Sequence, residues 1–453
     1  MASTPGFTGT SSYQGRPPGT PRTTLPPSLP LSFFGAAFVG LIACGIALIL
    51  AHNEGIADPT SDLLVAAAHF GMLATLSMGV LGALHQFTPV VTQRPLRSVL
   101  LARITFATWL AAAWLLPLGF ETRTEVLVEV GGGFAAIAIT LLTVNLWTSL
   151  GVKGKGAPVI GLRFAVAGFI ATACFGVVYV ADRQGKWFQL SGHVVLAHAT
   201  IGLFAWLGLT YISVAEKLWP MFFLSHVPGK RRSGLLAVFA IPIGIVLLSP
   251  GLLFEIPIFA WTGGAIISLG LGSHLLSLFA HLRYRKRKVD LYLIFVVTAA
   301  IWMVTGMALA LTAGLVISNN YHLGVMLVAA SVAAFGGWIL EAFVGHIHKV
   351  IPFVLWSMLR DRGIEKNLSG KQLMFGDLYN HWIASAVYGF ISIGVASVCV
   401  GFASSNPSFL IVGGSLLALS GGLLGINLSA KSVHILRIKS RAIEISPIPG
   451  DPN

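Results

Sequence analysis

The sequence predicts an all-α polytopic membrane protein with about twelve transmembrane helices. Of its 453 residues, 55% are hydrophobic and only 10% are charged, whereas a soluble protein of this length carries about 25% charged residues. Twelve apolar segments are long enough to cross a bilayer. Lysine and arginine gather in alternate connections between these segments, as the positive-inside rule requires. The net charge of +13 is therefore explained by membrane topology, and we expect a lipid bilayer and not nucleic acid as the partner.

The chain is expected to consist of a membrane domain between two tails. Residues 1–30 are rich in Pro, Gly, Ser and Thr, which predicts a disordered cytoplasmic tail. They are not a cleaved signal peptide, because the first apolar run starts too late and is too long. Residues 31–430 form the twelve-helix membrane domain, and residues 431–453 form a second cytoplasmic tail. The expected spans are 31–52, 63–91, 98–118, 126–150, 160–181, 189–215, 234–252, 257–282, 290–317, 322–348, 379–402 and 408–430.

The distribution of basic residues predicts the orientation of the chain. One side holds most of them, including the run from Arg283 to Lys288, whereas the opposite side holds only Arg123, Arg183 and Lys186. This asymmetry places both termini in the cytoplasm of a bacterial-type inner or plasma membrane.

The longest connection, 350–377, is then cytoplasmic. Its first part, 350–359, is apolar and predicts an interfacial helix with Trp356 at the level of the lipid headgroups.

Three of the expected helices end alike. Counted back from a proline, they read Gly82-Ala-Leu-His85-Gln-Phe-Thr-Pro89, Ser213-Val-Ala-Glu216-Lys217-Leu-Trp-Pro220 and Gly345-His346-Ile-His348-Lys349-Val-Ile-Pro352. Each follows an apolar helix with a histidine near its start: His69, His198 (with His193) and His322. This internal similarity suggests that the three helices do one job together, which we take to be holding a cofactor.

The histidines near the helix starts share the outer half of the membrane and suit a haem or metal. Imidazole is a good ligand for haem iron, copper and zinc. His69 with His322 is the pair that a six-coordinate haem b requires, if the second and tenth helices are neighbours. His193 and His198 lie about 140° apart around a helix, so only one of them, with His198 the deeper, could serve a second metal or haem.

Other ionisable residues carry open alternatives. Glu216, Lys217 and Glu341 suit either proton handling or a paired structural charge. Any single membrane histidine can equally bond a backbone carbonyl. A second set of histidines lies near the inner side of the membrane: His85, His274, His281, His346 and His348.

The chain resembles the haem–copper oxidase subunit I superfamily in its broad sense, which includes nitric oxide reductase large subunits and divergent NnrS-type haem proteins. The resemblance depends on twelve spans with both ends inside and on motifs in the second, sixth and tenth helices. These motifs are His69-Phe-Gly-Met with Pro89-Val-Val-Thr-Gln-Arg94-Pro-Leu, His198-Ala-Thr-Ile-Gly with Lys217-Leu-Trp-Pro-Met-Phe, and Gly345-His-Ile-His-Lys-Val-Ile-Pro-Phe.

The resemblance implies a subunit I-like bundle in which His69 and a histidine of the tenth helix ligate a low-spin haem. The family's His-x-His of that helix lies near the outer face, whereas His346-x-His348 falls near the cytoplasmic end. His322 has the matching depth and is the preferred second ligand, with His346 and His348 as alternatives. The seventh helix (234–252) has no His-His pair and the sixth has no His-Pro-Glu-Val-Tyr, so copper is not expected at the family's usual site.

The expected function is therefore that of a haem-binding membrane protein in respiratory electron transfer or nitric oxide handling. A small cytochrome or another electron donor would be its partner, and an oxidoreductase activity is implied only by the resemblance. The main alternative is a twelve-helix transporter or metal permease that uses the His and Glu positions as a path. A two-haem cytochrome b is disfavoured, because His69 to His85 spans about 24 Å of helix and His322 to His346 about 36 Å.

Overall fold

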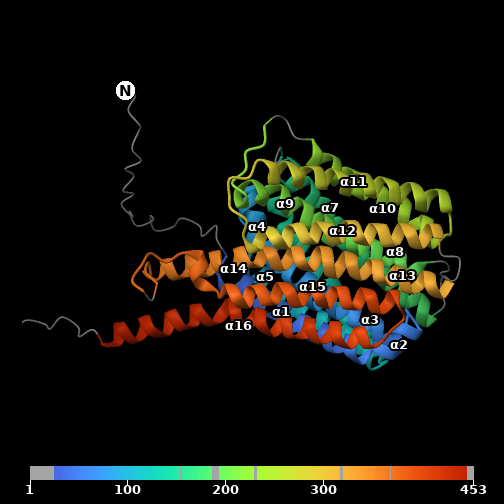
Figure 1. Cartoon of the computed structure of the whole chain (residues 1–453), viewed down its shortest axis with the longest axis horizontal. Coiled ribbons are helices and arrows are strands. Elements are labelled where there is room, and N and C mark those ends of the chain that lie inside the picture. Colours follow the sequence, from blue (N-terminus) through green and yellow to red (C-terminus); the bar gives the residue numbers. More distant parts are fainter. Residues whose placement is uncertain are drawn as a thin grey trace, which may run out of the picture.

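The computed structural model describes residues 25–153, 156–185, 193–228, 232–316, 320–367 and 369–445. Over this part of the chain, twelve helices are long and apolar enough to cross a membrane (Figure 1). The same residues contain no strand, only one isolated bridge between Lys366 and Gln372. The predicted fold class, an all-α polytopic membrane protein, is confirmed.

The π-helices η1, η2 and η3 each divide one span, and the short helices α2 and η4 lie in connections. The other spans are single helices. The elements in chain order are α1 (Ser28–Leu50), α2 (His52–Ala57), α3 (Asp62–His69), η1 (Phe70–Ser77), α4 (Met78–Thr92), α5 (Val99–Glu121), α6 (Glu125–Leu150), α7 (Gly156–Gly185), α8 (Val194–Thr200), η2 (Ile201–Gly208), α9 (Leu209–Phe222), α10 (Ser233–Leu253), α11 (Pro257–Arg283), α12 (Leu291–Val316), α13 (Asn320–Val332), η3 (Ala333–Leu340), α14 (Glu341–Asp361), η4 (Phe375–Leu378), α15 (His381–Ala403) and α16 (Ser408–Ile445).

The predicted spans agree with the observed ones except at a few ends. The sixth span continues to Phe222, past the proline at 220. The tenth continues to Asp361: residues 350–359, expected as an interfacial helix, are helical, and they extend α14 without a break. The helix α16 likewise runs on to Ile445, into the region expected to be a tail. Residues 1–24 and 446–453 of the two expected tails lie outside the described residues.

The second, sixth and tenth spans each contain an eight-residue π-helix: η1, η2 and η3. A π-helix is rare, and it occurs mostly as a single-turn bulge, often at a functional site. In all three spans the last π-helical residue lies twelve residues before the proline, at Pro89, Pro220 and Pro352. The internal similarity seen in the sequence is therefore a repeat of local backbone structure.

The repeat extends to whole four-helix units. Within each unit the helix that precedes the π-helical span packs on it: α1 on η1, α7 on η2 and α12 on η3. Each unit then closes with an antiparallel pair, namely α5 with α6, α10 with α11, and α15 with α16. The bundle thus consists of three similar units of four spans, with the π-helical spans at its centre.

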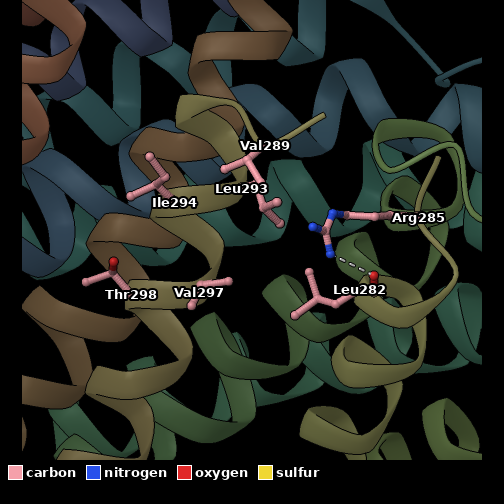
Figure 2. Close-up of a pocket in the computed structure, with 7 residues that line it drawn as sticks. All are labelled: Leu282, Arg285, Val289, Leu293, Ile294, Val297 and Thr298. Atoms are coloured by element: carbon pink, nitrogen blue, oxygen red, sulfur yellow. Dashed lines mark hydrogen bonds between the residues drawn. The ribbon is translucent and has the colours of Figure 1, made fainter. Parts of the chain in front are cut away.

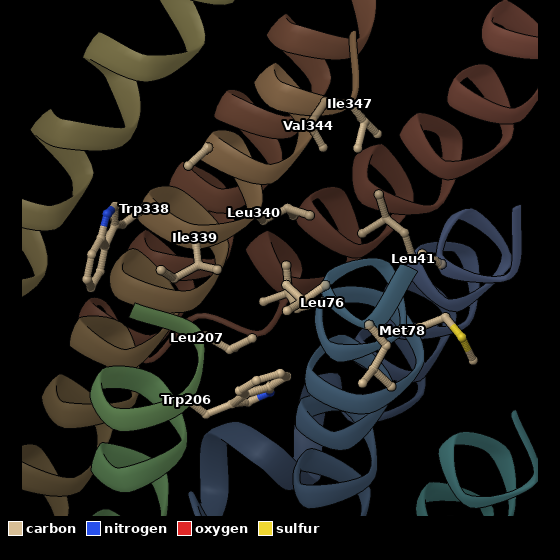
Figure 3. Close-up of a cluster of buried hydrophobic side chains, with 14 of the residues drawn as sticks. Leu41, Leu76, Met78, Trp206, Leu207, Trp338, Ile339, Leu340, Val344 and Ile347 are labelled. Carbon is tan, nitrogen blue, oxygen red and sulfur yellow. The ribbon is translucent and has the colours of Figure 1, made fainter. Parts of the chain in front are cut away.

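Three equivalent residues fill the place where the π-helices meet. Leu76, Leu207 and Ile339 are the seventh residues of η1, η2 and η3, and all three are buried. Figure 3 shows them gathered from their separate helices among other apolar side chains. The pseudo-three-fold axis is therefore closed by a hydrophobic layer.

Contacts between neighbouring π-helices also repeat. Trp206, the sixth residue of η2, donates its indole N–H to the hydroxyl of Ser77, the eighth residue of η1, at 2.9 Å. Trp338, the sixth residue of η3, lies against Gly208, the eighth residue of η2. The same sixth-to-eighth contact thus joins the first unit to the second and the second to the third.

Small residues let the first helix of a unit approach its π-helix closely. A Cβ atom at Gly40 of α1 would overlap the carbonyl of Ala74, and a Cβ at Gly168 of α7 would overlap that of Ala205. Ala74 and Ala205 are both fifth residues of their π-helices. In a bilayer, close packing of this kind is a main source of helix association.

The two ends of the bundle differ in charge. The basic end carries the loop Arg283–Lys288 and the last turns of α14, and lies toward the left in Figure 1. There, Lys349 is 2.6 Å from the carboxylate of Asp290, which also pairs with Arg287 at 3.1 Å. At the opposite end Arg123 contacts Glu54 at 3.1 Å.

Candidate functional site

His69 is the last residue of α3, directly before η1. Its ring Nδ1 lies 2.8 Å from the carbonyl oxygen of Val65, one turn earlier. A carbonyl can only accept, so Nδ1 carries the proton and Nε2 keeps its lone pair. This is the tautomer in which an imidazole binds a metal through Nε2.

His198 lies in α8, three residues before η2. Its ring is half-buried, and its Nδ1 atom is buried without a hydrogen-bond partner. Buried polar atoms are normally satisfied; His198 shares this orphan nitrogen with His85, His274 and His348, so it is the neighbouring His69 ring that distinguishes it.

The structure brings these two rings together. The centroids of His69 and His198 are 6.5 Å apart, and the ring planes differ by 19°. An imidazole–metal bond is about 2 Å long and the ring nitrogen lies about 1.2 Å from the ring centre, so two axial imidazoles on one metal place their centroids about 6.4 Å apart. The observed separation is close to this value, and the two rings are nearly parallel.

Aromatic and small residues surround the pair. Phe120, near the end of α5, lies 5.1 Å from the His69 ring centroid, and Phe175 of α7 lies 5.9 Å from that of His198. Gly176 is the next residue, and a Cβ there would stand 3.2 Å from Cε1 of His198. The two histidine-bearing segments are not each other's main neighbour, since α3 packs on α1 and α5 while α8 packs on α10.

The other outer histidines lie apart from this pair. His193 is exposed at the start of α8, where its backbone N–H bonds the carbonyl of Leu252. His322 is exposed near the start of α13. It stands eleven residues before η3, whereas His69 directly precedes η1. By the register of the π-helices, His322 lies about 15 Å further out than His69.

By the same register, His346 and His348 lie about 21 Å and about 24 Å along the bundle from His69, toward the basic end. Both are buried, and each ring Nδ1 bonds the carbonyl four residues earlier, Ala342 and Val344 respectively, at 2.7 Å. The Nε2 of His346 lies 3.1 Å from the hydroxyl of Tyr292. The two rings face different neighbours, so they do not form one site.

Around His346 the second and third units share a buried aromatic cluster. Tyr211 of α9 is its centre, with ring centroids 5.8 Å from His346, 5.4 Å from His274 and 6.0 Å from Trp338. Each of these three contacts is close to perpendicular, as aromatic pairs prefer. The cluster fills the interface between the units with side chains.

His348 lies in a different place, within the third unit. Phe295 of α12 stacks on it at 5.7 Å, just as Phe33 of α1 stacks on His85 at 5.6 Å. His85 and His348 are equivalent residues of the repeat, four before Pro89 and Pro352. In both, the Nε2 atom is buried without a partner.

Tyr379 covers His348 from the basic end, with ring centroids 5.8 Å apart. Burial, helped by the Asp290 carboxylate and opposed by Arg287, raises the pKa of the Tyr379 phenol above its usual value. The phenol therefore stays neutral at physiological pH.

Glu341, the first residue after η3, is fully buried. Its Oε1 accepts hydrogen bonds from the hydroxyl of Ser392 at 2.7 Å and from the indole N–H of Trp302 at 3.2 Å. Its Oε2 has no partner, and within the described part of the chain no cation pairs with it.

Glu216 and Lys217 differ from Glu341 in exposure. The Glu216 carboxylate lies against Gly234 in the first turn of α10, so a Cβ at Gly234 would press on it. The positive end of a helix dipole stabilises a carboxylate in such a place. Lys217 is exposed.

Among the described residues, no group of three or more His, Cys, Asp or Glu is placed to hold a metal ion. No protein-family model matches the chain, and no curated protein matches it.

Proposed function

We propose that this protein holds one haem b between His69 and His198 and passes single electrons through it. The observation that carries the proposal is the 6.5 Å separation of the two ring centroids. The expected pair of His69 with His322 is replaced in this proposal, because the register places His322 further out and His198 beside His69.

The residues of the chain prepare this position. The Val65 carbonyl fixes the tautomer of His69 and holds its Nε2 lone pair free for a metal. Phe120 and Phe175 pack beside the rings and reduce access of water. When bound, a haem with two axial imidazoles supplies a one-electron iron couple and has no open position for substrate. This favours electron transfer over chemistry on a bound small molecule.

We further propose that the basic end faces the cytoplasm of a bacterial-type inner or plasma membrane. The support is the excess of Lys and Arg at that end. His69 is then close to the outer face, since α3 begins at Asp62 only seven residues earlier. A small cytochrome or another electron carrier on that face would be the donor.

The test is to purify the protein from a haem-replete host and to measure haem per chain from a pyridine haemochrome spectrum. The wild-type protein is expected to be red, with about one haem b per chain. His69→Ala and His198→Ala are each expected to lower haem to below about a tenth, because even loss of a residue that supports a metal ligand weakens binding tenfold or more. His322→Ala is the matched control and is expected to keep its haem.

The rival function is a transporter or metal permease, in which the histidines line a path. A colourless wild-type protein would end the haem proposal and favour this rival. Loss of haem from His322→Ala but not from His198→Ala would restore the originally expected pair.

A further inference from the structure

A groove opens at the basic end between α11 and α12 (Figure 2). Its volume is about 330 Å³. The walls are formed by Leu282 at the end of α11, Val289 in the connecting loop, and Leu293, Ile294 and Val297 of α12. Thr298 lies at its inner end, but its hydroxyl is already bonded to that of Tyr388 at 2.9 Å. The inside of the groove is therefore apolar.

The groove lies at the junction between the second and third units, where the repeat predicts that two helices pack together. At the junctions between units, α16 packs along α1 and α6 packs on α7. At the third junction, α11 and α12 meet in a small cluster at the basic end, where Leu278 and Leu282 pack with residues of α12 around Trp219 and Phe223. Beside this cluster the groove is lined only by α11, α12 and the loop between them, among the residues that the structure describes.

The apolar surface of the groove continues along α12. Ile294 is 39% exposed, and Ile301, which is seven residues later on the same face, is 59% exposed. On α11, Phe279 is 63% exposed one turn before Leu282. An exposed apolar strip of this kind at bilayer depth is suited to a hydrocarbon chain.

Cationic residues stand at the mouth of the groove. The guanidinium of Arg285 reaches across from the loop toward Leu293, and one of its nitrogens donates to the Leu282 carbonyl at 3.1 Å. This bond uses one of five N–H donors and leaves the others for a ligand. Arg283, Lys286 and Lys288 are exposed in the same loop.

The loop is held in place, so its charge has a fixed position. The backbone N–H groups of Lys286 and Arg287 both donate to the carbonyl of Phe223, at 3.2 Å and 3.3 Å. The side chain of Arg287 is drawn to Asp290 at 3.1 Å. Arg285 is thus the cation that overhangs the groove.

We propose that this groove binds one anionic phospholipid, with an acyl chain between α11 and α12 and the phosphate on Arg285. A methylene group occupies about the volume of a water molecule, about 30 Å³, so the groove has room for about ten methylene groups of an acyl chain. Arginine binds phosphate through charge-assisted hydrogen bonds, and basic pockets between helices are suited to anionic headgroups. The lipid would take the place of the helix packing that the other two junctions have. This inference is independent of the haem proposal.

The experiment measures lipid retained by the delipidated full-length protein after exposure to equal amounts of phosphatidylglycerol and phosphatidylcholine, using native mass spectrometry. Wild type is expected to retain one phosphatidylglycerol with about fivefold preference, the value for one interfacial basic residue. Arg285→Glu is expected to lose the preference. Val297→Trp, which fills the groove, is expected to lose retention of either lipid.

Two matched variants serve as controls. Arg362→Glu makes the same charge change at an exposed arginine after α14, and Val246→Trp adds the same bulk at a 71% exposed position on α10. Both are expected to behave like wild type. Equal retention of the two lipids by wild type, or an equal loss of preference in Arg362→Glu, would overturn the proposal. If Arg285→Glu does not fold, Arg285→Gln and Val297→Trp still decide it.

Discussion

Gly176 on α7 allows a test of the His198 position that leaves both imidazoles unchanged. A Cβ atom at residue 176 would stand 3.2 Å from Cε1 of His198, whereas ordinary contacts are 3.4–4 Å. Gly176→Ala should therefore push the ring by a few tenths of an ångström. Metal–ligand distances tolerate only about 0.2 Å, so we expect haem affinity to fall about tenfold, as for other losses of ligand positioning. The branched side chain of Gly176→Leu would occupy space used by the ring and should abolish binding.

The assay is a titration of haem-depleted protein with haem, followed by the reduced spectrum. Gly272→Leu is the control, because a Cβ at Gly272 on α11 meets nothing within 4 Å. A glycine replaced by alanine inside a helix gains up to about 1 kcal/mol of stability, so the thermal stability of Gly176→Ala without haem should be equal or higher. Full haem binding by Gly176→Leu would refute the placement of His198 as a ligand.

Two more predictions concern buried hydrogen bonds near the centre of the bundle. Trp206 donates a 2.9 Å hydrogen bond to Ser77. In a double-mutant cycle of Trp206→Phe and Ser77→Ala, the free energies of unfolding in detergent should show a coupling of about 0.6 to 1 kcal/mol. Effects of the two substitutions that add within about 0.2 kcal/mol would contradict this. Glu341→Gln should unfold within about 1 kcal/mol of wild type, because its amide oxygen can still accept from Ser392 and Trp302, whereas Glu341→Ala leaves both donors unpaired and should cost about 2–3 kcal/mol. Equal damage by the two Glu341 variants would mean that the carboxylate is required.

Hydrophobicity and charge were enough to predict the spans, because each helix must satisfy its backbone within itself in a bilayer. The eighth span, expected over 257–282, was predicted to within one residue at each end. The errors lie where a helix leaves the apolar region. The expected tenth span ended at 348, just before Lys349, and the apolar residues 350–359 were assigned to the cytoplasmic connection. In the structure the helix continues through these residues. The indole N–H of Trp356 donates a hydrogen bond to the carbonyl of Leu373 in the following loop. Such a tertiary contact is not visible in local sequence.

The depth of each histidine in the bundle could have been compared from the sequence, by counting residues back from the three prolines. Counted back from the proline that ends each span, His69 lies 20 residues before Pro89 and His198 lies 22 before Pro220. His322 lies 30 residues before Pro352. The shared prolines could therefore have excluded His322 from the level of His69. The neighbours Phe120, Phe175 and Gly176 could not have been found in this way, because they come from α5 and α7 and have no motif in common.

The three units are alike in backbone but differ in chemistry, and the differences bear on function. A permeation path would run most simply along the pseudo-three-fold axis, where every unit contributes an equivalent lining. That axis is closed by Leu76, Leu207 and Ile339, which are buried and apolar. The paired histidines instead join only the first and second units, and the third has Val332 and Ala330 at the equivalent places. The cofactor that we propose would therefore lie beside this layer, between the first and second units.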